Sequence, residues 1–110
     1  MPLDFEIYLE DIRHAITKIQ RYTAGMTQIG LAEDSKTVDA VIRNLEIIGE
    51  AAKMIPESIR VEYPNIEWKK ISGLRDILAH HYFEVDLVIV WDIVQNKLPE
   101  LERYLSEKPK

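Results

Sequence analysis

An arginine, two histidines and a tyrosine stand within an otherwise largely apolar segment, GLRDILAHHYF, at residues 73–83. Arg75 carries a planar guanidinium that can hold two oxygens of a phosphate, a geometry that lysine does not reproduce. His80 carries an imidazole, which titrates near neutrality and can therefore give or take a proton during a reaction. His81 and Tyr82 follow directly. These residue types indicate a site that binds an anion and transfers protons.

The spacing of these residues sets a condition on such a site. On a continuous α-helix, Arg75 and His80 project about 140° apart, whereas Arg75 and Tyr82 share one face. We therefore expect Arg75 and His80 to cooperate only if the helix ends near His80 or if the pocket is built across a dimer axis. The alternative interpretation is structural, with Arg75 in solvent and His81 as a core histidine whose hydrogen bonds are satisfied.

Length and composition limit the classes of protein that could carry this site. The chain has 110 residues, 14 basic and 19 acidic side chains, a formal net charge of −5 and no Cys. The lack of Cys excludes disulfides and thiolate metal sites and fits a cytoplasmic protein. The acidic balance argues against non-specific nucleic-acid binding, although the segment from Trp68 to His81 is locally basic. No apolar run is long enough to span a membrane, so we expect a soluble, intracellular protein.

Apolar residues recur with a helical period, and no segment alternates convincingly with period two. We expect a single domain over residues 1–110, an all-α antiparallel helical bundle with a frayed tail from about residue 106. Gly25 should end the first helix, Ser35 or Thr37 should cap the second, and Pro99 predicts a kink or break in the last. The expected elements are helices over residues 4–22 and 37–54, a loop over 27–36, a short turn between Pro56 and Pro64, a helix near Ile66 capped by Asn65, and a last helix from near Asp86.

The helix expected over residues 37–54 is apolar on two sides, although one apolar stripe is enough to pack a surface helix onto its own domain. We therefore expect the second side to contact a second subunit. Asn44 lies within the apolar arc and needs hydrogen-bond partners if it is buried. The remaining strip is charged, and we interpret it as a solvated face; it comprises Asp39, Arg43, Glu46, Glu50 and Lys53.

Two runs of the chain together resemble a known family. The run RNLEIIGEAAKMIP at residues 43–56 and the later run WKKISGLRDILAHHYF are similar to sequences of the HEPN superfamily. The resemblance is greatest to HepT toxins, which are encoded beside minimal nucleotidyltransferase antitoxins of the MntA kind, and it covers nearly the whole chain. The family motif is an arginine, four residues, a histidine, one residue and a tyrosine. Arg75, His80 and Tyr82 match it at every defining position, and His81 fills the variable slot.

The resemblance implies an all-α homodimer that acts as a metal-independent ribonuclease, without a cofactor, in a cleft at the dimer interface. Arg75 and His80 would be its catalytic residues. It also implies that a cognate MntA-like nucleotidyltransferase antitoxin silences the toxin by transferring AMP to Tyr82. We expect RNA as the substrate, and neither DNA nor a membrane as a partner. Asn44 and Asp76 are candidates for supporting the site, where Asp76 either orients Arg75 or balances local charge.

Other interpretations remain open. The chain could be a non-catalytic helical module that helps a nucleotidyltransferase to hold its substrate, but inactive HEPN proteins usually lack the arginine–histidine pair that is present here. A purely structural dimerisation domain would explain the apolar second helix, yet it would leave Arg75, His80 and Tyr82 as coincidences. Tyr82 itself could be a packed residue with a wet hydroxyl rather than the nucleotide acceptor.

Overall fold

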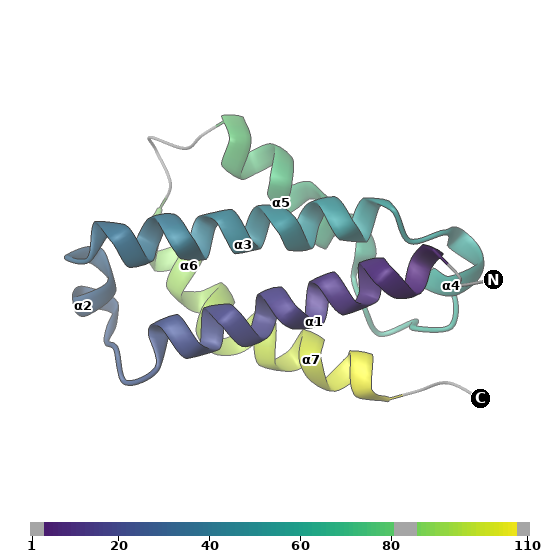
Figure 1. Cartoon of the computed structure of the whole chain (residues 1–110), viewed down its shortest axis with the longest axis horizontal. Helices are drawn as coiled ribbons and strands as arrows, with labels where there is room; N and C mark the ends of the chain where they lie inside the picture. The colour runs from purple at the N-terminus through teal and green to yellow at the C-terminus, as the bar shows by residue number, and fades with distance from the viewer. Residues whose placement is uncertain (1–3, 81–85, 108–110) are drawn as a thin grey trace.

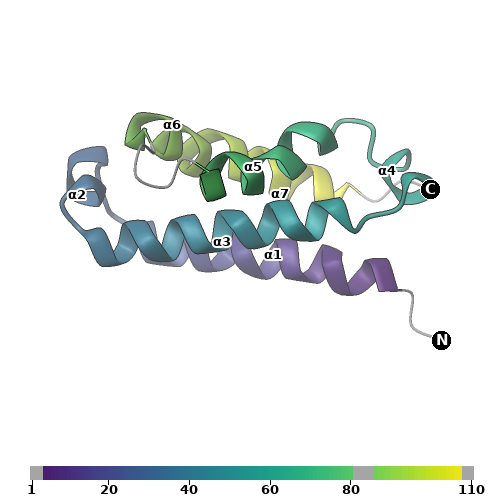
Figure 2. The same ribbon diagram turned by 90° about the horizontal axis from the view of Figure 1, so that it is seen from above.

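The computed structural model describes residues 4–80 and 86–107, and this part of the chain is helical and contains no strand, which confirms the all-α prediction. Long helical runs lie antiparallel in a bundle (Figures 1 and 2). None of the described helices combines the length and apolar character that crossing a bilayer requires. The elements are α1 (Asp4–Thr23), α2 (Gln28–Ala32), α3 (Ser35–Lys53), α4 (Glu57–Arg60), α5 (Trp68–His80), α6 (Leu87–Asp92), the π-helix η2 (Ile93–Lys97) and α7 (Leu98–Ser106).

The apolar stripes predicted for the first and last helices meet in one core. Ile12, Ile16 and Ile19 of α1 are buried, as are Leu45 and Ile48 of α3. Burying one such side chain stabilises a fold by about 1.5–3 kcal/mol. In the last run, Leu87 and Trp91 of the predicted stripe are half-buried, and its other members are buried: Val90, Val94, Leu98, Leu101 and Leu105.

Helix α3 lies between α1 and α5 and packs along both of them (Figures 1 and 2). On its second apolar side, Ala51 is buried, Ala40 and Ile47 are half-buried, and Met54 is exposed. The two apolar sides of α3 are thus explained largely by two helices of the same chain. The apolar pattern of this helix therefore does not require a second subunit, contrary to the reasoning from sequence.

Several element boundaries differ from the sequence-based predictions. The loop expected over residues 27–36 contains α2, which Thr27 caps by accepting a hydrogen bond from the Gly30 backbone N–H at 3.0 Å. The predicted caps of α3 are wrong, because Asp34 takes that place. Its carboxylate accepts from the Thr37 backbone N–H at 3.1 Å and from the Thr37 hydroxyl at 2.8 Å. Gly25 has φ 78° and lies two residues after the last residue of α1, in the turn that ends this helix as predicted.

The last two long runs also show where sequence reasoning succeeds and fails. Helix α5 begins at Trp68 rather than near Ile66, because a tight turn with a bond from Trp68 N–H to the Ile66 carbonyl (3.0 Å) precedes it. The last run starts beside Asp86 as predicted, and Asp86 caps α6 by accepting from the Val88 N–H at 2.9 Å. Pro99 causes no break. The chain runs from α6 through the π-helix η2 into α7, and Pro99, which lacks a backbone donor, is the second residue of α7.

Candidate active site

Two of the three motif positions lie on α5. The structure describes a helical backbone for Arg75 and His80. The side chains of residues 75–80, including Asp76, and all of residues 81–85, including Tyr82, lie outside the described residues. Helix geometry separates positions 75 and 80 by about 7.5 Å along the axis and about 140° around it. The condition that the helix ends near His80, or that two copies share the pocket, therefore stays a prediction.

The start of α5 is anchored to the end of α3 by Arg60. Its Nε donates to the Ile55 carbonyl at 3.0 Å, and a terminal nitrogen donates to the Ala52 carbonyl at 2.9 Å. These carbonyls lie at the C-terminal end of α3, where a cation meets the negative end of the helix dipole. In the reverse direction, Trp68 of α5 donates from Nε1 to the Arg60 carbonyl at 3.3 Å.

Aromatic contacts complete this anchor. The Arg60 guanidinium lies 5.8 Å from the centre of the Trp68 ring, and Tyr63 meets the same ring edge-on with centroids 6.3 Å apart. The anchor sets where α5 begins, and so it sets where the helix carries Arg75 and His80. Sequence analysis named Trp68 only as part of the family run and did not identify Arg60, whose partners are carbonyls that no sequence motif marks.

Asn44 is buried in the bundle, with 7% of its surface exposed. Its Nδ2 donates to the Ala40 carbonyl, one turn earlier in α3, at 2.9 Å. The need for a hydrogen-bond partner is therefore met inside α3, as the apolar surroundings of this residue predicted. This bond accounts for a structural role, and a role of Asn44 in supporting the site stays a prediction.

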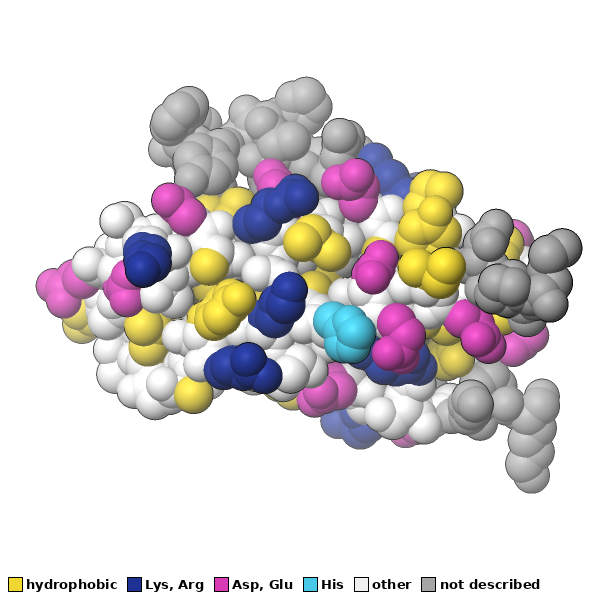
Figure 3. All heavy atoms as spheres, in the orientation of Figure 1, with side chains coloured by type: hydrophobic (Ala, Val, Ile, Leu, Met, Phe, Trp, Pro, Cys, Tyr) yellow, Lys and Arg dark blue, Asp and Glu magenta, His cyan; other side chains and the backbone are white. Residues whose placement is uncertain are grey.

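The outward face of α1 and α3 carries interspersed charges (Figure 3). Arg43 and Glu46 lie 3.7 Å apart, and the Arg43 side chain is 66% exposed, which confirms the interpretation of this strip as a solvated face. His14 is also exposed, 3.7 Å from Glu10. Among the side chains that the structure describes, those of residues 4–74 and 86–107, no three of His, Cys, Asp or Glu are grouped so that they could hold a metal ion.

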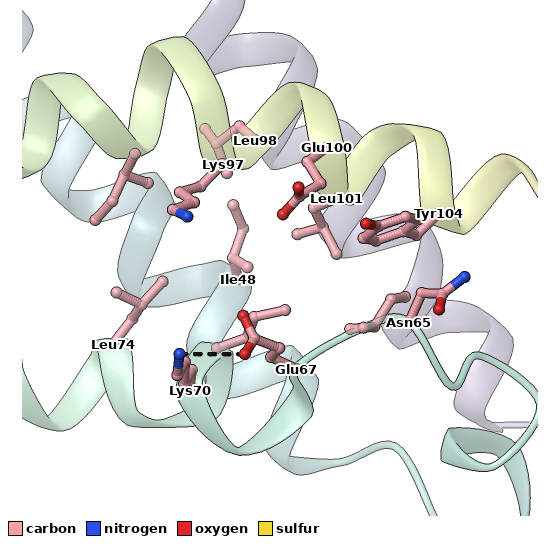
Figure 4. Close-up of a pocket in the computed structure, with 13 residues that line it drawn as sticks. Ile48, Asn65, Glu67, Lys70, Leu74, Lys97, Leu98, Glu100, Leu101 and Tyr104 are labelled. Carbon is pink, nitrogen blue, oxygen red and sulfur yellow. Dashed lines mark ion pairs between the residues drawn. The ribbon is translucent and has the colours of Figure 1, made fainter.

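An apolar groove of about 200 Å³ opens between α5 and the η2–α7 run (Figure 4). Ile48 of α3 forms its floor, and Leu74, the residue directly before Arg75, lines its α5 side. The groove therefore reaches the motif helix within one residue of the motif arginine. Its other lining residues include Lys70, Ile71, Ile93, Lys97, Leu98, Glu100, Leu101 and Tyr104.

Comparison with known proteins gives consistent matches over the described fold. A family model described as "Ribonuclease HepT-like" matches residues 12–107, which include α5. An RNase-family protein of Methanocaldococcus jannaschii is 46% identical over 104 residues, covering 94% of this chain and 86% of that protein. The "Probable ribonuclease HepT" of Thermococcus cleftensis is 43% identical over 95 residues, covering 86% of each protein.

A solved structure extends the match to three dimensions. It is that of a tri-AMPylated Shewanella oneidensis HEPN toxin in complex with an MNT antitoxin. The two chains superpose with a TM-score of 0.68 and 28% sequence identity over 96% of each. The family match, the relatives and the shared bundle agree with the resemblance of the motif runs. This chain belongs to the HepT-like ribonuclease family.

Proposed function

We propose that this chain is a metal-independent ribonuclease toxin that a cognate minimal nucleotidyltransferase antitoxin neutralises. The observation that carries the proposal is the match of Arg75, His80 and Tyr82 to the arginine–histidine–tyrosine motif in a chain of the HepT-like family. The solved HEPN toxin with which it superposes is AMPylated and bound to an MNT antitoxin. That pairing supports the same kind of partner for this chain.

The proposed chemistry uses the 2′-hydroxyl of RNA as the nucleophile. One imidazole takes the proton of that hydroxyl, whose oxygen attacks the adjacent phosphorus. The bond from phosphorus to the 5′-oxygen breaks, and a second imidazole returns a proton to the leaving oxygen. A positioned acid or base of this kind accelerates a reaction about 10²–10⁴-fold. The guanidinium of Arg75 stabilises the phosphate by holding two of its oxygens.

Each chain supplies one motif histidine, His80, whereas the reaction uses an acid and a base. A twofold axis near the motif would bring two copies of Arg75 and His80 into one cleft. Exposed apolar side chains support a contact there. Val88 and Ile89 lie in the first turn of α6, shortly after the motif segment in the chain, and are 58% and 59% exposed. Neighbouring apolar residues with this exposure favour a protein contact.

Silencing follows from the position of Tyr82, two residues beyond His80. AMP on its hydroxyl adds a bulky anion beside the proposed catalytic pair. The added phosphate competes with RNA for the Arg75 guanidinium, because both present the same oxygens. The nucleoside blocks access to the cleft.

RNA cleavage by the purified chain tests the catalytic proposal. Cleavage should persist in EDTA, and Arg75→Ala and His80→Ala should each abolish it while helical circular dichroism stays unchanged. His81→Ala should cause a smaller loss that follows stability, because this residue fills the variable slot of the motif. Full cleavage by both the Arg75 and His80 variants would falsify the assignment. Binding of RNA without cleavage by the unmutated chain would favour a non-catalytic binding module.

A further inference from the structure

On one wall of the groove between α5 and the η2–α7 run, the charged side chains form an ion pair. On the other wall they form none within the described residues. On the α5 side, Lys70 Nζ lies 3.1 Å from Glu67 Oε2. On the opposite wall, Lys97, Glu100 and Tyr104 extend into the groove (Figure 4). No hydrogen bond or ion pair joins these three side chains to another residue in the part of the chain that the structure describes. A few converging polar groups over an apolar floor are typical of a ligand site.

The chemistry of these groups defines a ligand. Glu100 is half-buried, and its carboxylate can only accept, so it suits an N–H edge. Lys97 suits an anion, and the Tyr104 hydroxyl can donate or accept. The apolar surfaces of Ile71 and Leu74 suit a flat ring. A planar ring with an amino edge, joined to an anionic group, is a nucleotide whose base carries an exocyclic amine.

We propose that the groove is a nucleobase subsite for the RNA strand that the motif cleaves. The proposal rests on the proposed ribonuclease function and adds base recognition to it. The base lies between the apolar walls, Glu100 accepts from its amino group, and Lys97 holds an adjacent phosphate. A carboxylate pairs in this way with the N4 amino group of cytosine. Uracil instead presents a carbonyl oxygen, which the carboxylate repels.

The position of the groove is compatible with a strand that also reaches the motif. Leu74 precedes His80 by six residues, which is about 9 Å along the axis of α5. RNA recognised by sequence is usually single-stranded, because unstacked bases can enter pockets of this kind. The charges of Lys70 and Lys97 balance those of Glu67 and Glu100. Recognition should therefore depend on the base more than on net charge.

Binding of uncleavable RNA to the unmutated full chain tests the subsite. Fluorescent 2′-O-methyl oligocytidylate and oligouridylate of equal length lack the nucleophile, so binding can be followed by anisotropy without cleavage. The chain should bind oligocytidylate about fivefold or more tightly than oligouridylate. Glu100→Ala should remove this preference. The control is Glu102→Ala. Glu102 lies at an exposed position of the same helix and accepts a hydrogen bond from Gln20, and this variant should keep the preference for oligocytidylate.

The role of Lys97 is tested with a matched control variant at another lysine. Lys97→Gln should weaken the binding of both oligonucleotides and should reduce the slope of log affinity against log salt concentration by about 0.7. Lys18→Gln, at an exposed position of α1, should change neither the affinities nor the salt slope. Circular dichroism of each variant establishes that it is folded, so a loss of preference can be assigned to the groove.

Equal affinity for the two oligonucleotides, no binding of either, or an unchanged preference in Glu100→Ala overturns the proposal. A change of oligomeric mass in Glu100→Ala or Lys97→Gln also overturns it, because a second copy would then cover the groove. Cleavage of unmodified RNA, measured in parallel, separates this proposal from the function on which it rests. If cytidine and uridine tracts are cleaved equally and bound equally, only the subsite proposal fails. If the chain prefers oligocytidylate but cleaves no RNA, only the catalytic assignment fails.

Discussion

At the residue scale, the proposed function divides the motif positions between groups that act on RNA and one that receives a modification. Arg75 keeps its charge at every working pH, because a guanidinium is too strong a base to lose its proton in water. An imidazole such as that of His80 changes charge near neutrality and so can serve as acid or base. A tyrosine hydroxyl stays protonated there and is a weak nucleophile unless an enzyme activates it. The proposed AMP transfer to Tyr82 therefore needs a catalyst from the partner.

Tyr82→Phe tests this division, since the change removes only the hydroxyl. With the cognate nucleotidyltransferase, ATP and Mg²⁺, the unmutated chain should gain one or more AMP units on intact mass and lose RNA cleavage. The variant should gain none and should keep cleaving, because the proposed catalytic pair is intact. Magnesium serves the partner's transfer reaction, where it neutralises the triphosphate. If the variant is labelled and silenced like the parent, the acceptor lies elsewhere in the chain.

At the element scale, α5 depends on contacts made outside the motif. Arg60 bonds two carbonyls at the end of α3 and stacks on Trp68, so this one side chain joins α3, α4 and α5. Helix α3 in turn depends on Asp34 for its first turn. Both residues act on the site only by positioning helices, and both can be tested through stability.

Arg60→Ala should lower the free energy of unfolding by about 2 kcal/mol, because it removes charged hydrogen bonds and leaves carbonyls without donors. Arg43→Ala is the matched control. It removes an exposed arginine that lies 3.7 Å from Glu46 and should cost less than about 0.5 kcal/mol. Urea unfolding followed by circular dichroism measures both. Equal losses in the two variants would show that Arg60 contributes no more than a surface charge.

Asp34 should make stability depend on pH in a defined direction. Hydrogen bonds from the Thr37 backbone and hydroxyl lower the pKa of Asp34 below its ordinary value of 3.8. Since the folded pKa is depressed, the ionised carboxylate stabilises the fold above pH 3.8, and this contribution is lost as the pH falls through the folded pKa. Asp34→Ala should therefore lower the melting temperature at pH 7, and the difference from the parent should shrink in acid. Asp11→Ala, at an exposed position of α1, should show no comparable change between the two conditions.

At the scale of the whole molecule, the proposed cleft needs two chains. The apolar pattern of α3 no longer argues for a dimer, because α1 and α5 largely cover that helix. The remaining arguments are the single motif histidine of each chain and the exposed apolar residues at the start of α6. They place the expected contact beside the motif rather than along α3.

Val88→Asp should disrupt the dimer by burying a carboxylate in the proposed contact. Light scattering should report twice the chain mass for the parent and a shift toward the single mass for the variant, with loss of RNA cleavage. Val61→Asp is the matched control, since Val61 is 62% exposed and directly follows α4, which lies at the opposite end of the bundle from α6 (Figure 1). It should remain dimeric and active. A parent that scatters as a clean monomer, yet cleaves RNA, would remove the composite cleft altogether.

The amino-acid sequence by itself determined the helical architecture, because apolar side chains recur at the helical period in each long run. It also carried the motif positions and the family, since these depend on residue identity and spacing within the chain. The helix end at Gly25 and the helix start near Asp86 were predicted correctly, because such signals are local. The short helix α2 was missed, since its five residues are too few to show a periodic pattern.

Only the tertiary structure decided what covers each apolar side of α3. The residue pattern of a helix side is the same whether the same chain or a second chain buries it. The anchor of Arg60 on Ala52 and Ile55 was likewise hidden, since backbone carbonyls are present at every residue. The groove beside Leu74 depends on how far α5 stands from the η2–α7 run. That separation follows from the packing of α5 on α3 and of α7 on α1, a relation between distant segments that no local pattern encodes.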